Sequence, residues 1–321
     1  MNLQVLGVDA AAYRPHDLHR TERVWLETNC YVDLWIELLH ALRLDPVASM
    51  AFTIAMDFEG DQWTFFKQPH ADLYRLYGLD VQELTIWRPV EQHAIEQIKD
   101  GRIPLVEVDS FHLPDTVGVA YGIEHTKTTI AIQAIDAASR RLGYFHNAGY
   151  FELGGEDYNG LFDAASASLA PYTEFVKLDR RITRSDAELS AIALDLTCHY
   201  VGRIPAVNPV SRYRERFADD MKWLADQDMS VFYKYAFATL RQCGACAEMA
   251  ATFLTWLSDR GGEPTPAIAE FCSIATDAKA LQFKIARMMA TKRPADLAAL
   301  LDQMETAWGR ATTDLVARYA T

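Results

Sequence analysis

The sequence has few cysteines, no long apolar run and fewer basic than acidic residues. Five cysteines in 321 residues are an odd, thinly spread number, which argues against a disulfide framework and predicts mostly free thiols; they are Cys30, Cys198, Cys243, Cys246 and Cys272. Polar side chains interrupt each apolar run within about ten residues, short of the roughly twenty that cross a bilayer, so no membrane span is predicted. With 31 Lys and Arg against 44 Asp and Glu, the net charge of -13 argues against nucleic-acid binding.

The first residues, MNLQVLGVDAAAYRPHDLHRTER, lack the basic start, apolar stretch and small-residue cleavage site of a secretory signal. We therefore expect a cytoplasmic protein. There is no internal repeat and no low-complexity tract. Half of the residues are hydrophobic, which is enough for one large core or two modest ones.

The two halves of the chain differ in their pattern of predicted helices and strands, and together they predict an α+β fold. Between about residues 23 and 151, helical segments alternate with short β-like runs, namely PLVEV (104–108), TTIAIQAI (128–135) and LGYFH (142–146). From Ser185 onward the pattern is helical, opening with a capping box to Glu188, and predicts a bundle of about five helices. The small, turn-rich segment from Gly154 to Pro171 predicts the boundary, with domains at 1–160 and 161–321.

Cys30 lies at or just before the N-terminus of a predicted amphipathic helix, YVDLWIELLHAL, whose apolar residues share one face. The partial positive charge at a helix N-terminus stabilises a thiolate, so Cys30 is a candidate nucleophile. The free N–H groups there, with Asn29 as an added donor, would stabilise an oxyanion. The alternative is a buried cysteine packed under the helix.

His125 lies just before the strong strand pattern at 128–135 and is the candidate base for Cys30. After the turn near 136–140 the chain returns through LGYFHN and brings Asn147 towards the same end, where it would orient the imidazole. Counting from the turn, Asn147 opposes Ile130, so either a bulge is present or Asp136 or Glu152 orients His125. His112 and His146 are alternatives to His125.

The order TNCYVDLWIELLHAL, VEVDSFHLPDT, EHTKTTIAIQAID and YFHNAGYFEL resembles an uncharacterised bacterial domain family distantly similar to the acyltransferase domain of butirosin biosynthesis. The resemblance covers roughly residues 20–160 closely and the helical half more loosely. It implies a papain-like N-terminal half, in which the helix bearing the cysteine packs on an antiparallel sheet, followed by an all-helical bundle. It also implies a Cys-His-Asn/Asp triad, carried over here to Cys30, His125 and Asn147, although the related pattern more often ends in Asp.

The same resemblance implies the reaction: transfer of an aminoacyl or acyl group from the phosphopantetheine thiol of a carrier protein to an amine or thiol acceptor. The expected partners are an acyl or aminoacyl carrier protein and a small-molecule or protein acceptor, with no nucleic acid and no membrane. Beyond the phosphopantetheine arm of the donor, no tightly bound cofactor is expected.

Asp109 closes the predicted strand at 104–108 and is a candidate for binding the free amino group of an aminoacyl donor; the alternative is a turn or helix cap. The CGAC sequence at Cys243–Cys246 lacks a second ligand pair and lies among small residues in a helical run. Close helix packing is the better interpretation of it, and we predict no metal site.

Two further functions remain open. A cysteine amidase or peptidase would use the same triad with water as the acceptor. In a catalytically inert module, the helical half would bind a carrier protein and the papain-like half would do no chemistry.

Overall fold

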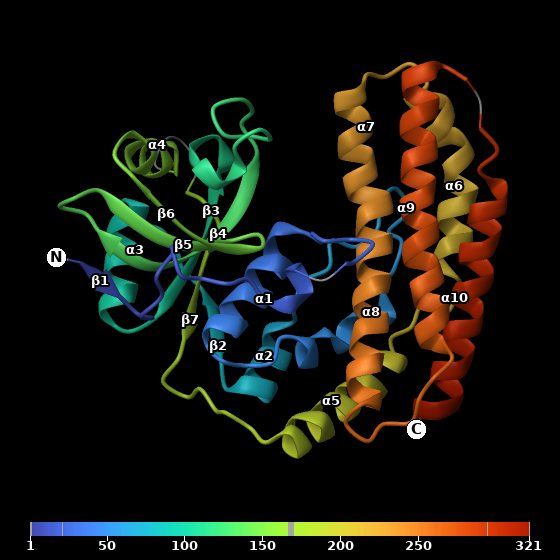
Figure 1. Cartoon of the computed structure of the whole chain (residues 1–321), viewed down its shortest axis with the longest axis horizontal. Helices are drawn as coiled ribbons and strands as arrows, with labels where there is room; N and C mark the ends of the chain where they lie inside the picture. Colours follow the sequence, from blue (N-terminus) through green and yellow to red (C-terminus); the bar gives the residue numbers. More distant parts are fainter. Residues whose placement is uncertain (1, 21, 166–169, 294, 321) are drawn as a thin grey trace. The chain divides into compact units, whose positions relative to one another are not determined.

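A computed structural model describes residues 2–20, 22–165, 170–293 and 295–320 (Figure 1). An antiparallel sheet with its helices occupies the N-terminal half, and helices follow, which confirms the predicted α+β class. The chain forms two compact units. The first comprises Met1–Thr21, Asn29–Pro46 and Pro69–Thr183, and the second comprises Glu22–Thr28, Val47–Gln68 and Arg184–Thr321.

The first unit is built on a seven-stranded sheet with the order β2-β7-β3-β4-β5-β6, in which β1 pairs with β4. All these pairings are antiparallel. The strands are β1 (Leu3–Gln4), β2 (Asp80–Glu83), β3 (Ile103–Asp109), β4 (Lys127–Asp136), β5 (Arg141–His146), β6 (Gly149–Gly154) and β7 (Thr173–Lys177). The three β-like runs of the sequence thus become β3, β4 and β5, three neighbours in the sheet.

Different helices cover the two faces of the sheet. Alternate residues of β3, such as Val106 and Val108, join an apolar core with helices α3 (Val90–Lys99) and α4 (Glu156–Ala165). Helix α1 (Cys30–Ala41) packs against β4 and β5 on the opposite face. A short helix, α2 (His70–Tyr77), packs against β2. The residues of β3 between the core positions, Leu105, Glu107 and Asp109, therefore face the side of α1.

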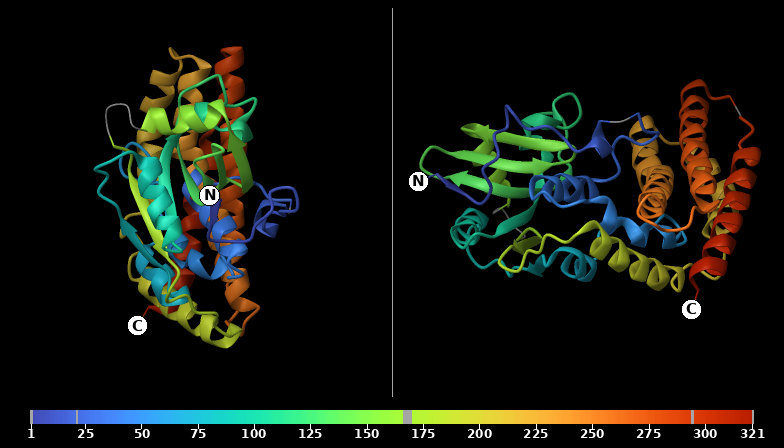
Figure 2. Two further views of the ribbon diagram at one scale, coloured as in Figure 1. Left: turned by 90° about the vertical axis from the view of Figure 1, so that its left-hand side faces the viewer. Right: turned by 60° about the horizontal axis from the view of Figure 1, so that its bottom comes forward.

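The second unit is helical. Its helices are α5 (Asp186–Val201), α6 (Pro209–Leu224), α7 (Met229–Ala236), α8 (Gln242–Ser258), α9 (Ala267–Thr291) and α10 (Ala298–Tyr319). Helix α9 packs against both α8 and α10, and the close pairing of α9 with α10 is visible in orange and red in Figure 2. The capping box of Ser185 and Glu188 is present at the start of α5, as predicted. A π-helical turn, Phe237–Arg241, joins α7 to α8.

The CGAC sequence lies inside α8, where Cys243 and Cys246 are both buried. Burial raises the pKa of both thiols, and the Sγ of Cys246 donates to the backbone oxygen of Thr53 at 3.6 Å. Gly244 lies against the indole of Trp25, where a Cβ atom would come within 2.5 Å of Nε1. The small residues of this stretch thus serve close packing.

The segment predicted as the domain boundary, 154–171, contains α4, and four of its residues, 166–169, lie outside the described part of the chain. Strand β7 follows and inserts between β2 and β3, so the sheet takes up residues beyond 160. The change from the first to the second unit comes at Thr183 and Arg184. Among the described residues, no helix is long and apolar enough to cross a membrane.

Candidate functional site

Cys30 is the first residue of α1, as the sequence predicted, and its side chain is half-buried. Asn29 is the N-cap. Its side-chain oxygen accepts the N–H of Tyr31 at 3.2 Å and the N–H of Val32 at 3.0 Å. Asn29 therefore caps α1. The N–H groups of Tyr31 and Val32 that it binds are among those that the sequence assigned to stabilising an oxyanion. The thiol lies beside the positive end of the helix dipole.

His125 pairs with Asp109, for which the sequence left open substrate binding or a turn or helix cap. The imidazole Nδ1 lies 2.5 Å from Oδ2 of Asp109, and the ring stacks on Phe111 with centroids 4.4 Å apart. Asp109 also accepts the N–H of Phe111. Burial would raise the pKa of Asp109, but the hydrogen bonds from His125 and Phe111 outweigh it and hold this pKa below its usual value.

This pairing fixes the tautomer of a neutral His125. Because a carboxylate only accepts, Nδ1 carries the proton and Nε2 keeps its lone pair. The His125 side chain is 72% exposed, so Nε2 is accessible to a substrate. A histidine held by a carboxylate in this way is the arrangement of a general base.

Asn147 lies in the turn between β5 and β6, with a φ of 45°. The sequence left open either a bulge or another orienting residue, and a bulge is present between Ile132 and Ala134 of β4. Since Ala131 pairs with Phe145, continuing the register brings Asn147 opposite Thr129, still short of His125. The bulge thus moves Asn147 one residue along β4, and Asp109 is the residue that holds the imidazole.

The other residues weighed as partners of His125 also lie elsewhere. Asp136 ends β4, at the opposite end of the strand from His125, and its carboxylate accepts the N–H of Ala138. Glu152 on β6 forms an ion pair with Arg141. Neither of these carboxylates contacts His125 in the described part of the chain.

His146 is buried and forms a chain of hydrogen bonds of its own. Its Nδ1 lies 2.6 Å from Asp115 Oδ2, and its Nε2 lies 2.7 Å from Thr128 Oγ1. Tyr144 donates to the other oxygen of Asp115. The His146 and Asp115 side chains are only 1% and 3% exposed, so this network serves to tie the loop after β3 to β4 and β5. The ring of His112, the remaining alternative, packs against Gly160.

A second pair of histidine and carboxylate, which no sequence pattern indicated, lies beside the start of α1. Glu174 of β7 is buried and accepts the hydroxyls of Tyr31 and Tyr172, each at 2.7 Å. His70, the first residue of α2, places Nε2 at 2.9 Å from the Tyr31 hydroxyl oxygen and 3.4 Å from Oε1 of Glu174. Tyr31 directly follows Cys30, so this cluster lies at the first turn of α1.

Both pairs lie on the α1 face of the sheet. Glu174 pairs with Leu105 across β7 and β3, whereas Asp109 ends β3 and pairs with Lys127. Four residues of strand separate Leu105 from Asp109, which corresponds to about 13 Å along β3. Within the described residues, neither His70 nor His125 hydrogen-bonds to the Cys30 thiol.

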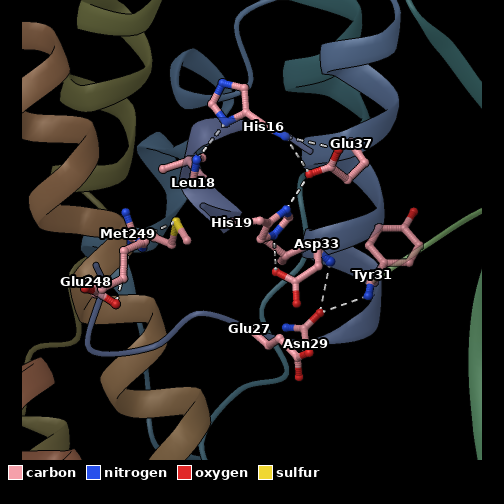
Figure 3. Close-up of polar contacts among 12 residues, drawn as sticks. His16, Leu18, His19, Glu27, Asn29, Tyr31, Asp33, Glu37, Glu248 and Met249 are labelled. Atoms are coloured by element: carbon pink, nitrogen blue, oxygen red, sulfur yellow. Dashed lines mark hydrogen bonds and ion pairs between the residues drawn. The ribbon is translucent and has the colours of Figure 1, made fainter. Parts of the chain in front are cut away.

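A buried histidine, His19, pairs with two carboxylates, Asp33 and Glu37, of the helix that bears Cys30 (Figure 3). His19 places Nδ1 at 2.5 Å from Glu37 Oε1 and Nε2 at 3.3 Å from Asp33 Oδ1. All three side chains are at most 1% exposed. Among the described residues, no group of three or more His, Cys, Asp or Glu is suited to hold a metal ion.

Comparison with known proteins places the chain in a family. The model of the DUF1839 N-terminal domain matches residues 14–178, and the model of the DUF1839 C-terminal domain matches residues 186–317. The chain belongs to the DUF1839 family. No curated protein matches it at a significant level. The two matched segments meet near the linker where the structure changes from the first unit to the second.

Proposed function

We propose that this DUF1839 protein is a cysteine-dependent acyltransferase that moves an aminoacyl or acyl group from a carrier-protein thioester to an amine or thiol. The observation that carries the proposal is the position of Cys30. Its thiol lies half-buried at the capped N-terminus of α1, on the sheet face that also bears two histidines held by carboxylates. The resemblance of the sequence motifs to the acyltransferase domain of butirosin biosynthesis implies the same reaction.

The reaction has two steps. The Cys30 thiolate attacks the thioester carbon, and the carbon–sulfur bond to the phosphopantetheine thiol breaks as that thiol leaves with a proton. The acceptor amine or thiol then attacks the acyl-enzyme, loses its proton to the base and releases Cys30. No oxidant, metal or further cofactor enters this scheme.

A histidine whose second ring nitrogen is fixed by a carboxylate carries the proton in both steps. The sequence points to His125 for this role, and Asp109 would orient it through their direct hydrogen bond. His70, held by Glu174, is the second candidate. Asp109 is then engaged with His125, so the structure offers less support for its binding the amino group of the donor.

Intact-protein mass spectrometry after mixing the protein with a panel of loaded carrier proteins tests the proposal. We expect an acyl-sized mass increase in the wild type that Cys30→Ser does not show. Among matched variants, Asp109→Asn should slow turnover if Asp109 orients His125, whereas Asn147→Gly keeps the positive φ of the turn and should react like the wild type.

Other outcomes identify the competing functions. Release of free acid without coupling to any added acceptor would indicate an amidase or peptidase. A panel of competent donors that yields neither an adduct nor Cys30-dependent loss of loaded carrier would contradict the proposal and favour an inert binding module.

A further inference from the structure

We infer that His70, oriented by Glu174 and Tyr31, is the base that takes the proton from the Cys30 thiol. The inference deepens the proposed function and rests on it, because it assigns the proton transfer of the proposed acylation step. It changes the base from the histidine that the sequence pointed to.

The position of the cluster supports this assignment. Tyr31 is the residue after Cys30, and its hydroxyl contacts His70 Nε2 at 2.9 Å. His70 is therefore hydrogen-bonded to a side chain of the first turn of α1, from the residue that follows Cys30. Its side chain is 39% exposed, whereas the Glu174 side chain is only 4% exposed, so the imidazole faces an accessible space and its carboxylate partner does not.

The hydrogen bonds also determine which nitrogen of His70 accepts a proton. Tyr31 has a single hydroxyl proton and donates it to Glu174 Oε2 at 2.7 Å. Burial and the nearby Glu174 charge raise the pKa of the Tyr31 hydroxyl, so Tyr31 keeps this proton. Nε2 of His70 must then be the donor to the Tyr31 oxygen, and Nδ1 keeps the lone pair that a base needs.

The register of the sheet separates the two pairs of histidine and carboxylate. Glu174 on β7 pairs with Leu105 on β3, and Asp109 lies four residues further along β3. The Cα atoms of Glu174 and Asp109 are therefore about 14 Å apart. A base must come within about 3 Å of the proton it takes, directly or through one water. Histidines held by these two carboxylates serve different positions along the sheet face.

In the step itself, the S–H proton of Cys30 moves to Nδ1 of His70, directly or through one water. The resulting imidazolium stays hydrogen-bonded through Nε2 to Tyr31 and Glu174, and the buried carboxylate balances its charge. The same proton then goes to the departing thiol of the donor. His125 and Asp109 are left to contact a more distant part of the donor or acceptor.

Alkylation of Cys30 by iodoacetamide tests the inference without any acyl donor. The rate of Cys30 modification is measured from pH 5 to 10 by peptide mass spectrometry of the full-length protein. The exposed Cys272 of the same sample serves as an internal standard. Wild type, His70→Ala, Glu174→Gln, Tyr31→Phe and His125→Ala are compared.

We expect His70→Ala to lower the Cys30 alkylation rate at pH 7 about tenfold and to move the pH profile of alkylation to higher pH, because the thiol loses its proton acceptor. Glu174→Gln should show a smaller shift in the same direction. If Ala at position 70 disturbs the fold, Tyr31→Phe gives the second test, because it removes one hydroxyl from the cluster while keeping the ring.

A shift of the Cys30 profile in His125→Ala, with none in His70→Ala, would overturn the inference in favour of His125. Unchanged profiles in both variants would overturn it as well. The proposed function can fail separately. If the Cys30 alkylation profile depends on His70 but no acyl adduct forms with the carrier panel, His70 remains the base of Cys30 and the acyltransferase proposal is contradicted.

Discussion

His19 is a buried histidine whose two ring nitrogens both face carboxylates. Burial by itself would lower the pKa of His19, but the hydrogen bonds and charges of Asp33 and Glu37 raise it to about 9. Glu37 shows the matching effect: burial would raise its pKa, and its hydrogen bonds to His19 and Tyr13 hold that pKa below the usual value. His19 is thus an imidazolium at neutral pH, paired with two acids of α1.

The charge on His19 should make stability depend on pH. Its folded pKa of about 9 lies above the ordinary 6.5, so its stabilisation is complete below about pH 6.5 and is lost as the pH rises through 9. We expect the free energy of unfolding to fall by about 2–3 kcal/mol across this interval. Urea denaturation at several pH values measures the slope.

The variant His19→Gln provides the control for this prediction. Gln has no titrating group, so the difference in unfolding free energy between wild type and variant should shrink as the pH rises from 6.5 to 9. A difference that stays constant over this range would show that His19 does not carry the charge.

At the scale of elements, α8 lies so close to a neighbouring segment of its own unit that one position admits only glycine. A Cβ atom on Gly244 would lie 2.5 Å from Nε1 and 2.6 Å from Cε2 of Trp25. The indole is 1% exposed, and its N–H donates to the backbone oxygen of Ala275 in α9 at 3.0 Å. Trp25 therefore cannot move aside without losing this hydrogen bond.

We expect Gly244→Ala to destabilise the protein by about 1–3 kcal/mol, because overpacking here outweighs the better helix propensity of alanine. Gly309→Ala in α10 is the matched control, since no neighbouring atom lies within 4 Å of its Cβ position. It should stabilise the protein by about 0.5–1 kcal/mol. Urea denaturation compares them, and equal effects of the two substitutions would contradict the close packing.

At the scale of the whole molecule, the two units do not correspond to two uninterrupted stretches of chain. Residues 22–28 and 47–68 precede most of the sheet in sequence but belong to the helical unit. Within that unit the 3-10 helix Val47–Ala55 packs against α5 and α8, and Trp25 packs against α8. The family model of the C-terminal domain, which starts at residue 186, covers only the continuous part of this unit.

A fragment of residues 184–321 should therefore be less stable than the same helices in the full chain. It lacks Trp25 and the apolar 3-10 helix, so it exposes the faces of α5 and α8 that these segments cover. We expect a broad thermal transition with a lower midpoint by circular dichroism. A fragment that melts as cooperatively as the full-length protein, at the same temperature, would contradict this prediction.

The sequence by itself determined the features that depend on a few neighbouring residues. The capping box of Ser185, the placement of Cys30 at a helix start and the three strand runs are all set by patterns within about ten residues, where capping and alternation act. The α+β class follows from the order of these elements along the chain.

Only the tertiary structure decided which side chains meet. Tyr31 and Glu174 are 143 residues apart in sequence, and they pair because β7 inserts beside β3. The partner of His125 depended on register: Asp109 ends β3 opposite Lys127, close to His125, whereas Asn147 aligns only with Thr129 even after the bulge in β4. Such pairings arise because burial and strand hydrogen bonding bring distant segments together, and no local pattern encodes their register.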